Sequence, residues 1–120
     1  LLHGLDALVD PRADAPARDT VVVLHQLGNH GPAYHRRYPP AFARFRPACE
    51  RAELRDCSRE EIVNAYDNAI AYTDHVLARL IAFLDARRDR FDVAMAYVSD
   101  HGESLGERGL YLHGMPRAVA

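Results

Sequence analysis

A long stretch in the middle of the chain has the hydrophobic periodicity of a helix. Ser58 with Glu61 three residues later is a capping-box signature, in which each side chain binds the other residue's backbone N–H. Arg87 and Arg88 would stand in the last turn, where cations suit the helix dipole. The pattern therefore predicts a helix over Ser58–Arg88. Its apolar stripe, with a spacing of about 3.6 residues, consists of Ile62, Tyr66, Ala69, Ile70, Thr73, Val76, Leu77, Leu80, Ile81 and Leu84.

Two short apolar runs flank this helix. Thr20–His25 and Phe91–Val98 are rich in apolar residues and do not alternate with polar ones, which is typical of strands buried on both faces of a parallel sheet. Strand, helix and strand in this order form a right-handed crossover unit. A further helix is predicted over Leu1–Val9, where Asp10-Pro11 ends it. The elements indicate the α/β class.

Both predicted strands lead into polar loops. The first loop, Gln26–Pro40, is rich in Gly, Asn, His, Pro and Tyr, and it is long for a connection. The second, Ser99–Ser104, follows the other strand. Because the carboxyl ends of parallel strands meet at one edge of the sheet, where such folds bind ligands, we expect the two loops to lie together.

An acidic residue and a histidine stand side by side where the second predicted strand ends. Burying both Asp100 and His101 is unfavourable unless a partner such as a divalent cation binds them. Zinc accepts carboxylate oxygens and imidazole nitrogens, and Gly102 permits a tight turn beside them. The alternative is that Asp100 caps the turn while His101 lies exposed. The leading hypothesis is a metal site for hydrolysis or group transfer.

Further side chains could join this site. His30 lies in a loop too polar and kinked for the core, so we predict a metal ligand or a phosphate contact there. His113 stands twelve residues beyond His101, and residues 105–110 would turn the chain back towards the metal. Glu103 is either a partner of a metal ligand or a general acid or base, or else an exposed loop carboxylate.

The sequence offers no convincing nucleophile for such a site. Thr20 starts a predicted strand and Thr73 lies in the apolar stripe of the helix. Ser99 and Ser104 flank the metal motif without a base dedicated to either. Two firm ligands also leave a tetrahedral zinc short of donors. We therefore expect the remaining catalytic parts to come from sequence outside these 120 residues.

Composition and charge narrow the class of protein. Hydrophobic residues make up 48% of the chain and charged residues 27%, as in soluble globular segments. The formal net charge of −2 argues against nucleic acid as the main partner. No run approaches the roughly 20 apolar residues of a membrane span. Since the first residues look like the end of a helix already under way, we expect a fragment of a longer protein.

The two cysteines lie in a polar, charge-rich stretch. Cys49 and Cys57 are close enough in sequence to form a local disulfide, which would indicate an oxidising compartment. A loop of this size would contribute roughly 2–3 kcal/mol to stability. The alternative is a pair of unrelated free thiols in a cytosolic loop.

Several strings of the sequence match a known family in order and spacing, from Thr20 to Ala120. They are VVVLHQLGNHGPAYHRRYP, FARFRPACE, ELRDC, IVNAYDNAIAYTDHVL and YVSDHGESLGERGLYLHGMP. By these strings the chain resembles the catalytic domain of the phosphoethanolamine–lipid A transferases, which include the mobilised colistin-resistance enzymes. The wider group is the alkaline phosphatase/sulfatase superfamily, for which an Asp-His-Gly element after a strand is typical.

The resemblance implies a fold and a reaction. The fold would be a partial alkaline phosphatase/sulfatase-like sandwich with a mainly parallel sheet flanked by helices, and residues 1–120 would be the C-terminal portion of its catalytic domain. The reaction would be zinc-dependent transfer of phosphoethanolamine from phosphatidylethanolamine to a lipid A phosphate, which gives polymyxin or colistin resistance. An N-terminal membrane anchor, absent here, would hold the domain at the periplasmic face of the Gram-negative inner membrane.

The resemblance also implies roles for single residues. Asp100 and His101 look like zinc ligands. His30, His113 and Glu103 look like residues of a site that binds the phosphoethanolamine group or a second metal.

Two other features follow from the resemblance. Cys49 and Cys57 look like one of the family's disulfides, which supports the periplasm. The nucleophilic threonine of the family, and the glutamate that completes its first zinc site, would lie upstream of Leu1. We therefore expect the 120 residues alone to be inactive.

Three alternatives remain. The first is the same transfer to core heptose, Kdo sugars or a periplasmic glucan. The second is a sulfatase or phosphodiesterase, which the strings HQLGNHGP and LHGMP disfavour. The third is a non-catalytic metal-binding or dimerising module that pairs through an exposed sheet edge.

Overall fold

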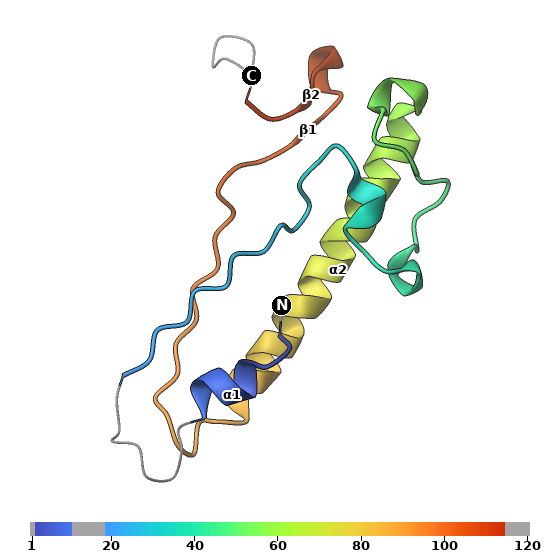
Figure 1. Cartoon of the computed structure of the whole chain (residues 1–120). Coiled ribbons are helices and arrows are strands. Elements are labelled where there is room, and N and C mark those ends of the chain that lie inside the picture. Colours follow the sequence, from blue (N-terminus) through green and yellow to red (C-terminus); the bar gives the residue numbers. More distant parts are fainter. Residues whose placement is uncertain (1, 11–18, 115–120) are drawn as a thin grey trace.

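One long helix organises the structure, which is a computed structural model that describes residues 2–10 and 19–114. This helix, α2, runs from Arg59 to Asp85, and the other described segments lie along its length (Figure 1). The radius of gyration is 18.3 Å, whereas a compact domain of this length would have roughly 14 Å. The chain is therefore elongated around α2 and has only a small core.

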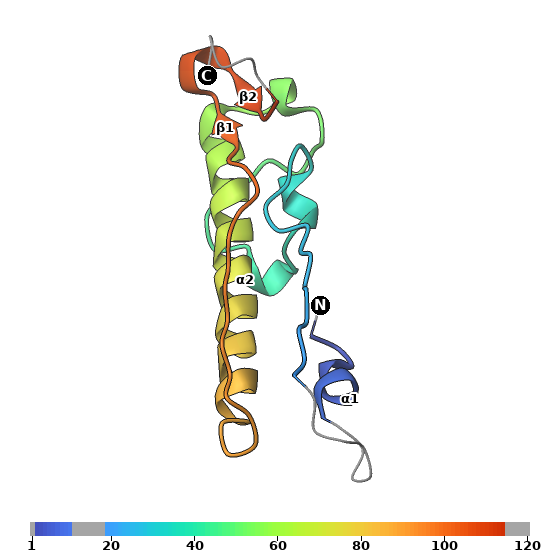
Figure 2. The ribbon, with the colours of Figure 1, turned by 90° about the vertical axis from the view of Figure 1, so that its left-hand side faces the viewer.

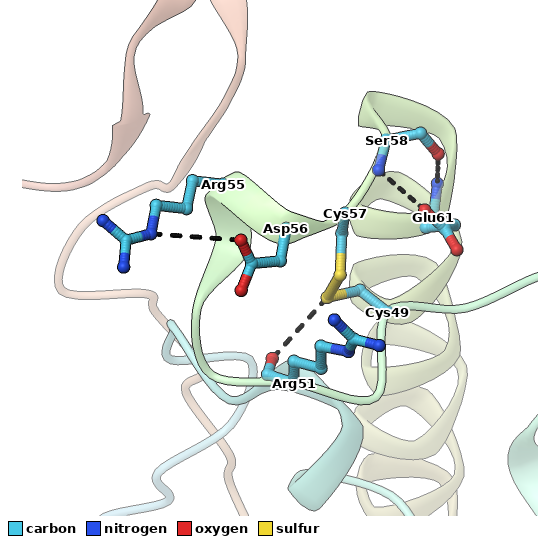
Figure 3. Close-up of a disulfide and its surroundings, with 7 residues drawn as sticks. All are labelled: Cys49, Arg51, Arg55, Asp56, Cys57, Ser58 and Glu61. Atoms are coloured by element: carbon cyan, nitrogen blue, oxygen red, sulfur yellow. Dashed lines mark hydrogen bonds and ion pairs between the residues drawn. A yellow bond between two sulfur atoms is a disulfide. The ribbon is translucent and has the colours of Figure 1, made fainter.

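The capping box predicted at the start of α2 is confirmed. The Ser58 hydroxyl accepts a hydrogen bond from the Glu61 backbone N–H at 3.2 Å, and the Ser58 N–H donates to the Glu61 carboxylate at 2.6 Å (Figure 3). The helix ends at Asp85, somewhat before the predicted Arg88. Both capping bonds satisfy N–H groups that the first turn of a helix otherwise leaves free.

The capping box makes part of the stability dependent on pH. The hydrogen bonds from Ser58 hold the pKa of Glu61 below its ordinary value. A lowered carboxyl pKa contributes stability above the ordinary value of about 4.3, and this contribution is lost as the pH falls through the folded-state pKa. We therefore expect Glu61→Gln to lose less stability than the wild type between about pH 7 and about pH 3, measured by urea unfolding. An equal loss in both proteins would contradict this.

A disulfide pins the preceding loop to the start of α2. Cys49 and Cys57 are bonded, with their Cα atoms 5.8 Å apart, which confirms the predicted pair (Figure 3). The Cys49 N–H donates to the carbonyl of Glu61 at 2.9 Å, so the backbone makes the same connection. The disulfide thus fixes the loop against the first turn of the helix.

The core lies against the amino-terminal half of α2. Its buried members are Tyr34, Cys49, Ile62 and Ala65. Partly buried side chains from the carboxyl-terminal segment pack on it, namely Leu105, Tyr111 and Leu112. Short 3₁₀-helices shape the loops around it: η1 (Tyr34–Arg36), η2 (Pro40–Phe42) and η3 (Leu54–Asp56). The core therefore joins the first loop and the end of the chain to one face of the helix.

A buried asparagine ties the loop before the disulfide to α2. The Asn68 side chain is 0% exposed, and its Oδ1 accepts from the backbone N–H groups of Arg44 and Phe45, each at 2.8 Å. Its Nδ2 donates to the Phe45 carbonyl at 3.0 Å and to the Tyr38 hydroxyl at 3.3 Å. One helical side chain thus satisfies backbone groups that no regular element pairs.

A short hairpin follows the second extended segment. Strand β1 (Ser104–Leu105) pairs antiparallel with β2 (Tyr111–Leu112), and the 3₁₀-helix η4 (Glu107–Gly109) connects them. The register places Ser104 opposite Leu112. This confirms the prediction that residues 105–110 turn the chain back on itself.

The two predicted parallel strands are not formed among the described residues. Thr20–His25 and Phe91–Val98 are extended, but the sheet of the described chain contains only β1 and β2. Val23 and Val98, expected to be buried, are each 86% exposed. The parallel sheet is therefore not confirmed by the described chain, because a strand requires a hydrogen-bonded neighbour and neither segment has one there.

The path of the chain nevertheless agrees with the predicted crossover. Both extended segments run along α2 towards its amino-terminal end (Figures 1 and 2). The side of α2 that lines the cavity beside them is only partly covered: Ile70 is 46% exposed. The described chain therefore has the order of an α/β crossover, with an extended segment, a helix and an extended segment, but these segments do not form a parallel sheet.

A second helix packs near the carboxyl-terminal end of α2. Helix α1 runs from Leu5 to Val9, so it begins later than predicted, because residues 2–4 are not helical. The predicted stop at Pro11 lies outside the described residues. Arg87 donates to the carboxylate of Asp10 at 2.9 Å, which lowers the pKa of Asp10. No helix of the described residues combines the length and apolarity needed to cross a bilayer.

Candidate functional site

Three histidines lie close together near the amino-terminal end of α2, where both extended segments end. The ring centroids of His101 and His113 lie 4.1 Å apart, and those of His30 and His113 lie 4.6 Å apart. One nitrogen from each ring lies within 4.8 Å of the other two. The expected meeting of the two loops is thus confirmed, and His113 joins them.

Each of these rings has its Nδ1 next to an oxygen atom. Nδ1 of His30 lies 2.8 Å from the Gly31 carbonyl, and Nδ1 of His101 lies 2.9 Å from the Gly102 carbonyl. Because carbonyl and ionised carboxylate oxygens accept but do not donate, the proton lies on Nδ1. The other nitrogen, Nε2, then has a free lone pair that can bind a metal ion.

The hairpin explains how His113 reaches the site. Since Ser104 faces Leu112 in the register, the next pair outward is Glu103 and His113. Nδ1 of His113 lies 3.1 Å from Oε1 of Glu103. A carboxylate on the far nitrogen of a metal-binding histidine orients the ring and raises its basicity. Glu103 therefore contacts the histidine cluster through Nδ1 of His113.

Glu103 is the most enclosed acidic group of the site, with a side chain 4% exposed. Besides His113, its Oε1 accepts from the Gly31 backbone N–H at 3.0 Å. Its Oε2 accepts from the Tyr34 hydroxyl at 3.2 Å. Of the alternatives for Glu103, the structure favours the partner of a ligand over an exposed loop carboxylate.

Asp100 lies at the rim of the site. Its side chain is 81% exposed, and Oδ1 accepts from the His101 backbone N–H at 3.1 Å, as in the turn-capping alternative. The second oxygen, Oδ2, lies 3.9 Å from Nε2 of His101. Two ligands of one zinc at about 2.1 Å each stand about 3–4 Å apart. The geometry therefore places Oδ2 and Nε2 where one cation could contact both.

Sequence reasoning did not single out Tyr34 or Gly31. Tyr34 is 1% exposed, and burial together with the charge of Glu103 raises the pKa of its hydroxyl, so that it remains a donor. The Gly-Pro pair at 31–32 signals a turn. The packing of Gly31 against Leu112 and Tyr34, however, is a tertiary contact that no local pattern indicates.

A side chain at position 31 would push the first loop away from the hairpin. A Cβ there would lie 2.6 Å from Cδ2 of Leu112 and 2.8 Å from the Tyr34 hydroxyl. We expect Gly31→Ala to lower the free energy of unfolding by about 1–3 kcal/mol, as overpacked sites do, and to weaken zinc binding. Denaturant unfolding and zinc titration measure the two effects.

Gly102→Ala is the matched control for Gly31→Ala. Gly102 adjoins His101, but a Cβ at this position would meet no atom within 4 Å. We expect its stability and zinc affinity to stay near those of the wild type. Equal effects of the two substitutions would contradict the steric explanation.

Polar contacts hold the first loop against α2. The Thr73 hydroxyl donates to Oδ1 of Asn29 at 2.7 Å and accepts from Gln26 at 3.4 Å. Arg37 donates to the His30 carbonyl at 2.7 Å. These contacts of Asn29, on one side of His30, and of Arg37, on the other, therefore fix the backbone position of His30.

The donor set fits a zinc ion. Imidazole nitrogens and carboxylate oxygens are the ligands that zinc uses besides thiolates. His30, His101 and His113 present free nitrogens, and Asp100 and Glu103 supply negative charge beside them. The same group can also bind the oxygens of a phosphoryl ligand once a cation is present.

Comparisons with known proteins agree with the resemblance. The chain is 52% identical over 120 residues to phosphatidylethanolamine transferase Mcr-1 of Escherichia coli. The match covers 100% of this chain and 22% of Mcr-1. The soluble domain of lipooligosaccharide phosphoethanolamine transferase A from Neisseria meningitidis superposes with a TM-score of 0.84 at 39% identity, covering 99% of this chain and 34% of that one.

A second solved structure is also similar. The C-terminal periplasmic domain of phosphoethanolamine transferase EptC from Campylobacter jejuni has a TM-score of 0.68 at 45% identity, covering 78% of this chain and 30% of that one. The chain spans about a fifth of the length of the curated relatives that it matches. The sequence model of the sulfatases matches residues 1–120 without a gap at either end. The chain belongs to the sulfatase family.

Proposed function

We propose that this chain is the carboxyl-terminal part of the catalytic domain of a zinc-dependent phosphoethanolamine transferase. The observation that supports this most is the convergence of His30, His101 and His113, each with Nδ1 engaged and Nε2 free. Such an arrangement is typical of histidines that ligate a divalent cation, which supports the proposal. The named activities of Mcr-1 and of the superposed structures supply the reaction class.

In the proposed site the residues have separate roles. Asp100 and His101 hold the zinc, and His30 and His113 bind the phosphoethanolamine group or a second metal. Glu103 orients His113 by accepting from its Nδ1. A bound zinc ion would supply a Lewis acid that neutralises charge on the phosphoryl oxygens.

The proposed donor is phosphatidylethanolamine and the proposed acceptor a lipid A phosphate. In a first step the nucleophile's hydroxyl would form a P–O bond as the P–O bond to diacylglycerol breaks, and its proton would go to the departing diacylglycerol. In a second step an oxygen of the acceptor phosphate would form a new P–O bond as the bond to the nucleophile breaks, and the nucleophile would regain a proton. The names of Mcr-1 and of the lipooligosaccharide transferase support this pair. The expected consequence is resistance to polymyxin and colistin, with the domain at the periplasmic face of the inner membrane, as the disulfide and the periplasmic relative support.

The nucleophile is proposed to come from outside these 120 residues. The hydroxyls beside the site have other partners: Ser99 donates to the His101 carbonyl at 2.6 Å, and Ser104 donates to the Leu110 carbonyl at 3.1 Å. Thr73 donates to Asn29. Ser104 also lies 3.0 Å from Oε2 of Glu107, but that carboxylate oxygen already accepts from the Leu105 backbone N–H at 2.7 Å.

The part of the protein outside these 120 residues, which is proposed to supply the nucleophile, would also complete the parallel sheet. Thr20–His25, Phe91–Val98 and the apolar side of α2 line a cavity of about 1980 Å³. Small-molecule sites measure about 300–1,000 Å³, so this space suits packed polypeptide better than a ligand. Strands from the rest of the domain would pair with both extended segments and cover Ile70.

The test is to express the full-length protein in a Gram-negative host and to analyse its lipid A by mass spectrometry. We expect phosphoethanolamine on lipid A, loss of the modification on zinc chelation and recovery on adding zinc. Phosphoethanolamine on Kdo, core heptose or glucan instead would select the alternative acceptors. Zinc binding without transfer to any of them would select the non-catalytic module.

The 120 residues alone are expected to show no turnover. Among the described residues, the hydroxyls of Thr73, Ser99 and Ser104 donate to other groups of the protein, and the apolar side of α2 is partly uncovered. The purified chain should therefore release no diacylglycerol from a phosphatidylethanolamine donor. Measurable release would contradict the assignment of the nucleophile to another part of the protein.

A further inference from the structure

We propose that Tyr34 is a positioning residue whose buried hydroxyl fixes the Glu103 carboxylate, and through it the rings of His113 and His30. The proposal rests on the proposed function of this site and adds a residue that does not touch metal or substrate. Tyr34 donates to Oε2 of Glu103 at 3.2 Å, while the ring of Tyr34 belongs to the core. It therefore connects the rigid part of the fold to the site.

The two oxygens of Glu103 have different partners. Oε1 accepts from the Gly31 N–H at 3.0 Å and from Nδ1 of His113 at 3.1 Å, so this one atom joins the first loop to the hairpin. For Oε2, the Tyr34 hydroxyl is the donor that the described residues provide. Because a carboxylate rotates as a unit, holding Oε2 also determines where Oε1 lies.

The core holds the Tyr34 ring in place. Tyr34 is 1% exposed, and its ring packs edge-to-face against Tyr66 of α2 with centroids 5.5 Å apart. It also lies in η1, four residues after His30, so the same loop contains a site residue and its support. A movement of Glu103 would therefore require the phenol to leave a packed position.

Loss of the hydroxyl should disturb the site more than the fold. Tyr34→Phe keeps the ring and its contact with Tyr66, but it leaves Oε2 of a carboxylate that is 4% exposed without its donor. A buried polar group without a partner is unfavourable, so the carboxylate will turn towards other donors. Such a turn moves Oε1 away from Gly31 and His113.

The experiment compares Tyr34→Phe with Tyr66→Phe in the full-length protein. Both remove one phenolic oxygen from the same edge-to-face pair, but no hydrogen bond of the Tyr66 hydroxyl occurs among the described residues. Zinc affinity is measured by competition with a chromophoric chelator, and stability by thermal unfolding. We expect Tyr34→Phe to weaken zinc binding about tenfold, the lower end for losing a partner outside the ligands. Tyr66→Phe should not change it.

Two outcomes would overturn the proposal. One is equal zinc affinity in the two variants. The other is that both variants lose thermal stability and that zinc affinity falls in proportion to this loss. The role of Tyr34 would then be structural.

The crystal structure of the metal-free Tyr34→Phe protein separates this proposal from the proposed function. If the wild type binds no zinc, the zinc assignment fails, but the geometry can still be examined. We then expect Glu103 to leave its position 3.1 Å from His113. An unchanged Glu103, with both Oε1 contacts kept, would overturn the positioning role whatever the site binds.

Discussion

Replacing His101 by alanine should abolish phosphoethanolamine transfer by the full-length protein. Its Nε2 is free to bind a cation and lies 3.9 Å from Oδ2 of Asp100, so the substitution removes a central donor of the proposed zinc site. Zinc affinity should fall by more than about 100-fold, because losing only an outer partner of a ligand already costs about 10- to 100-fold. Chelator competition and lipid A mass spectrometry measure the two effects.

His3→Ala is the control for this substitution. His3 is an exposed histidine that precedes α1 and belongs to no group of possible metal ligands among the described residues. Its removal should leave zinc affinity and transfer unchanged. If His101→Ala also bound zinc as tightly as the wild type, the metal assignment of His101 would be wrong.

Replacing Asn68 by alanine should give the largest loss of stability in the chain. The substitution leaves the N–H groups of Arg44 and Phe45 and the Phe45 carbonyl without their partner. Each such group costs about 1–3 kcal/mol when it stays buried, so the free energy of unfolding should fall by about 3 kcal/mol or more. Urea unfolding measures this loss.

Asn64→Ala is the matched control, one helical turn earlier on α2. Its Nδ2 donates once, to the Pro47 carbonyl at 2.8 Å, in an exposed position. Its replacement should cost about 1 kcal/mol or less. Similar losses for the two asparagines would show that the loop does not depend on Asn68.

Local sequence patterns predicted those features that depend on few neighbours. The start of α2 follows from Ser58 and Glu61 alone, and the disulfide from two nearby cysteines. The meeting of His30 and His101 required only the direction of the chain before and after a long helix. These features depend on local chemistry and on connectivity, which a single sequence contains.

The features that failed or were missed depend on distant partners. The extended segment Thr20–His25 has the composition of a strand, but composition does not provide the neighbour that forms a ladder. Asn68 does not break the helical pattern of α2, so the sequence does not mark it. Its contribution to stability comes from hydrogen bonds to loop backbone groups distant in sequence. Likewise, the sequence shows Tyr34 only as a tyrosine in a polar loop, because its hydrogen bond to Glu103 is a tertiary contact.

The register of β1 with β2 limits how this region can vary in length. Glu103 and His113 meet because they are the next pair beyond Ser104 and Leu112. Adding or deleting a single residue between them would shift the pairing by one position and turn the imidazole to the opposite face of the ribbon. Substitutions in the turn can be tolerated, whereas a change in its length would separate the carboxylate from its histidine.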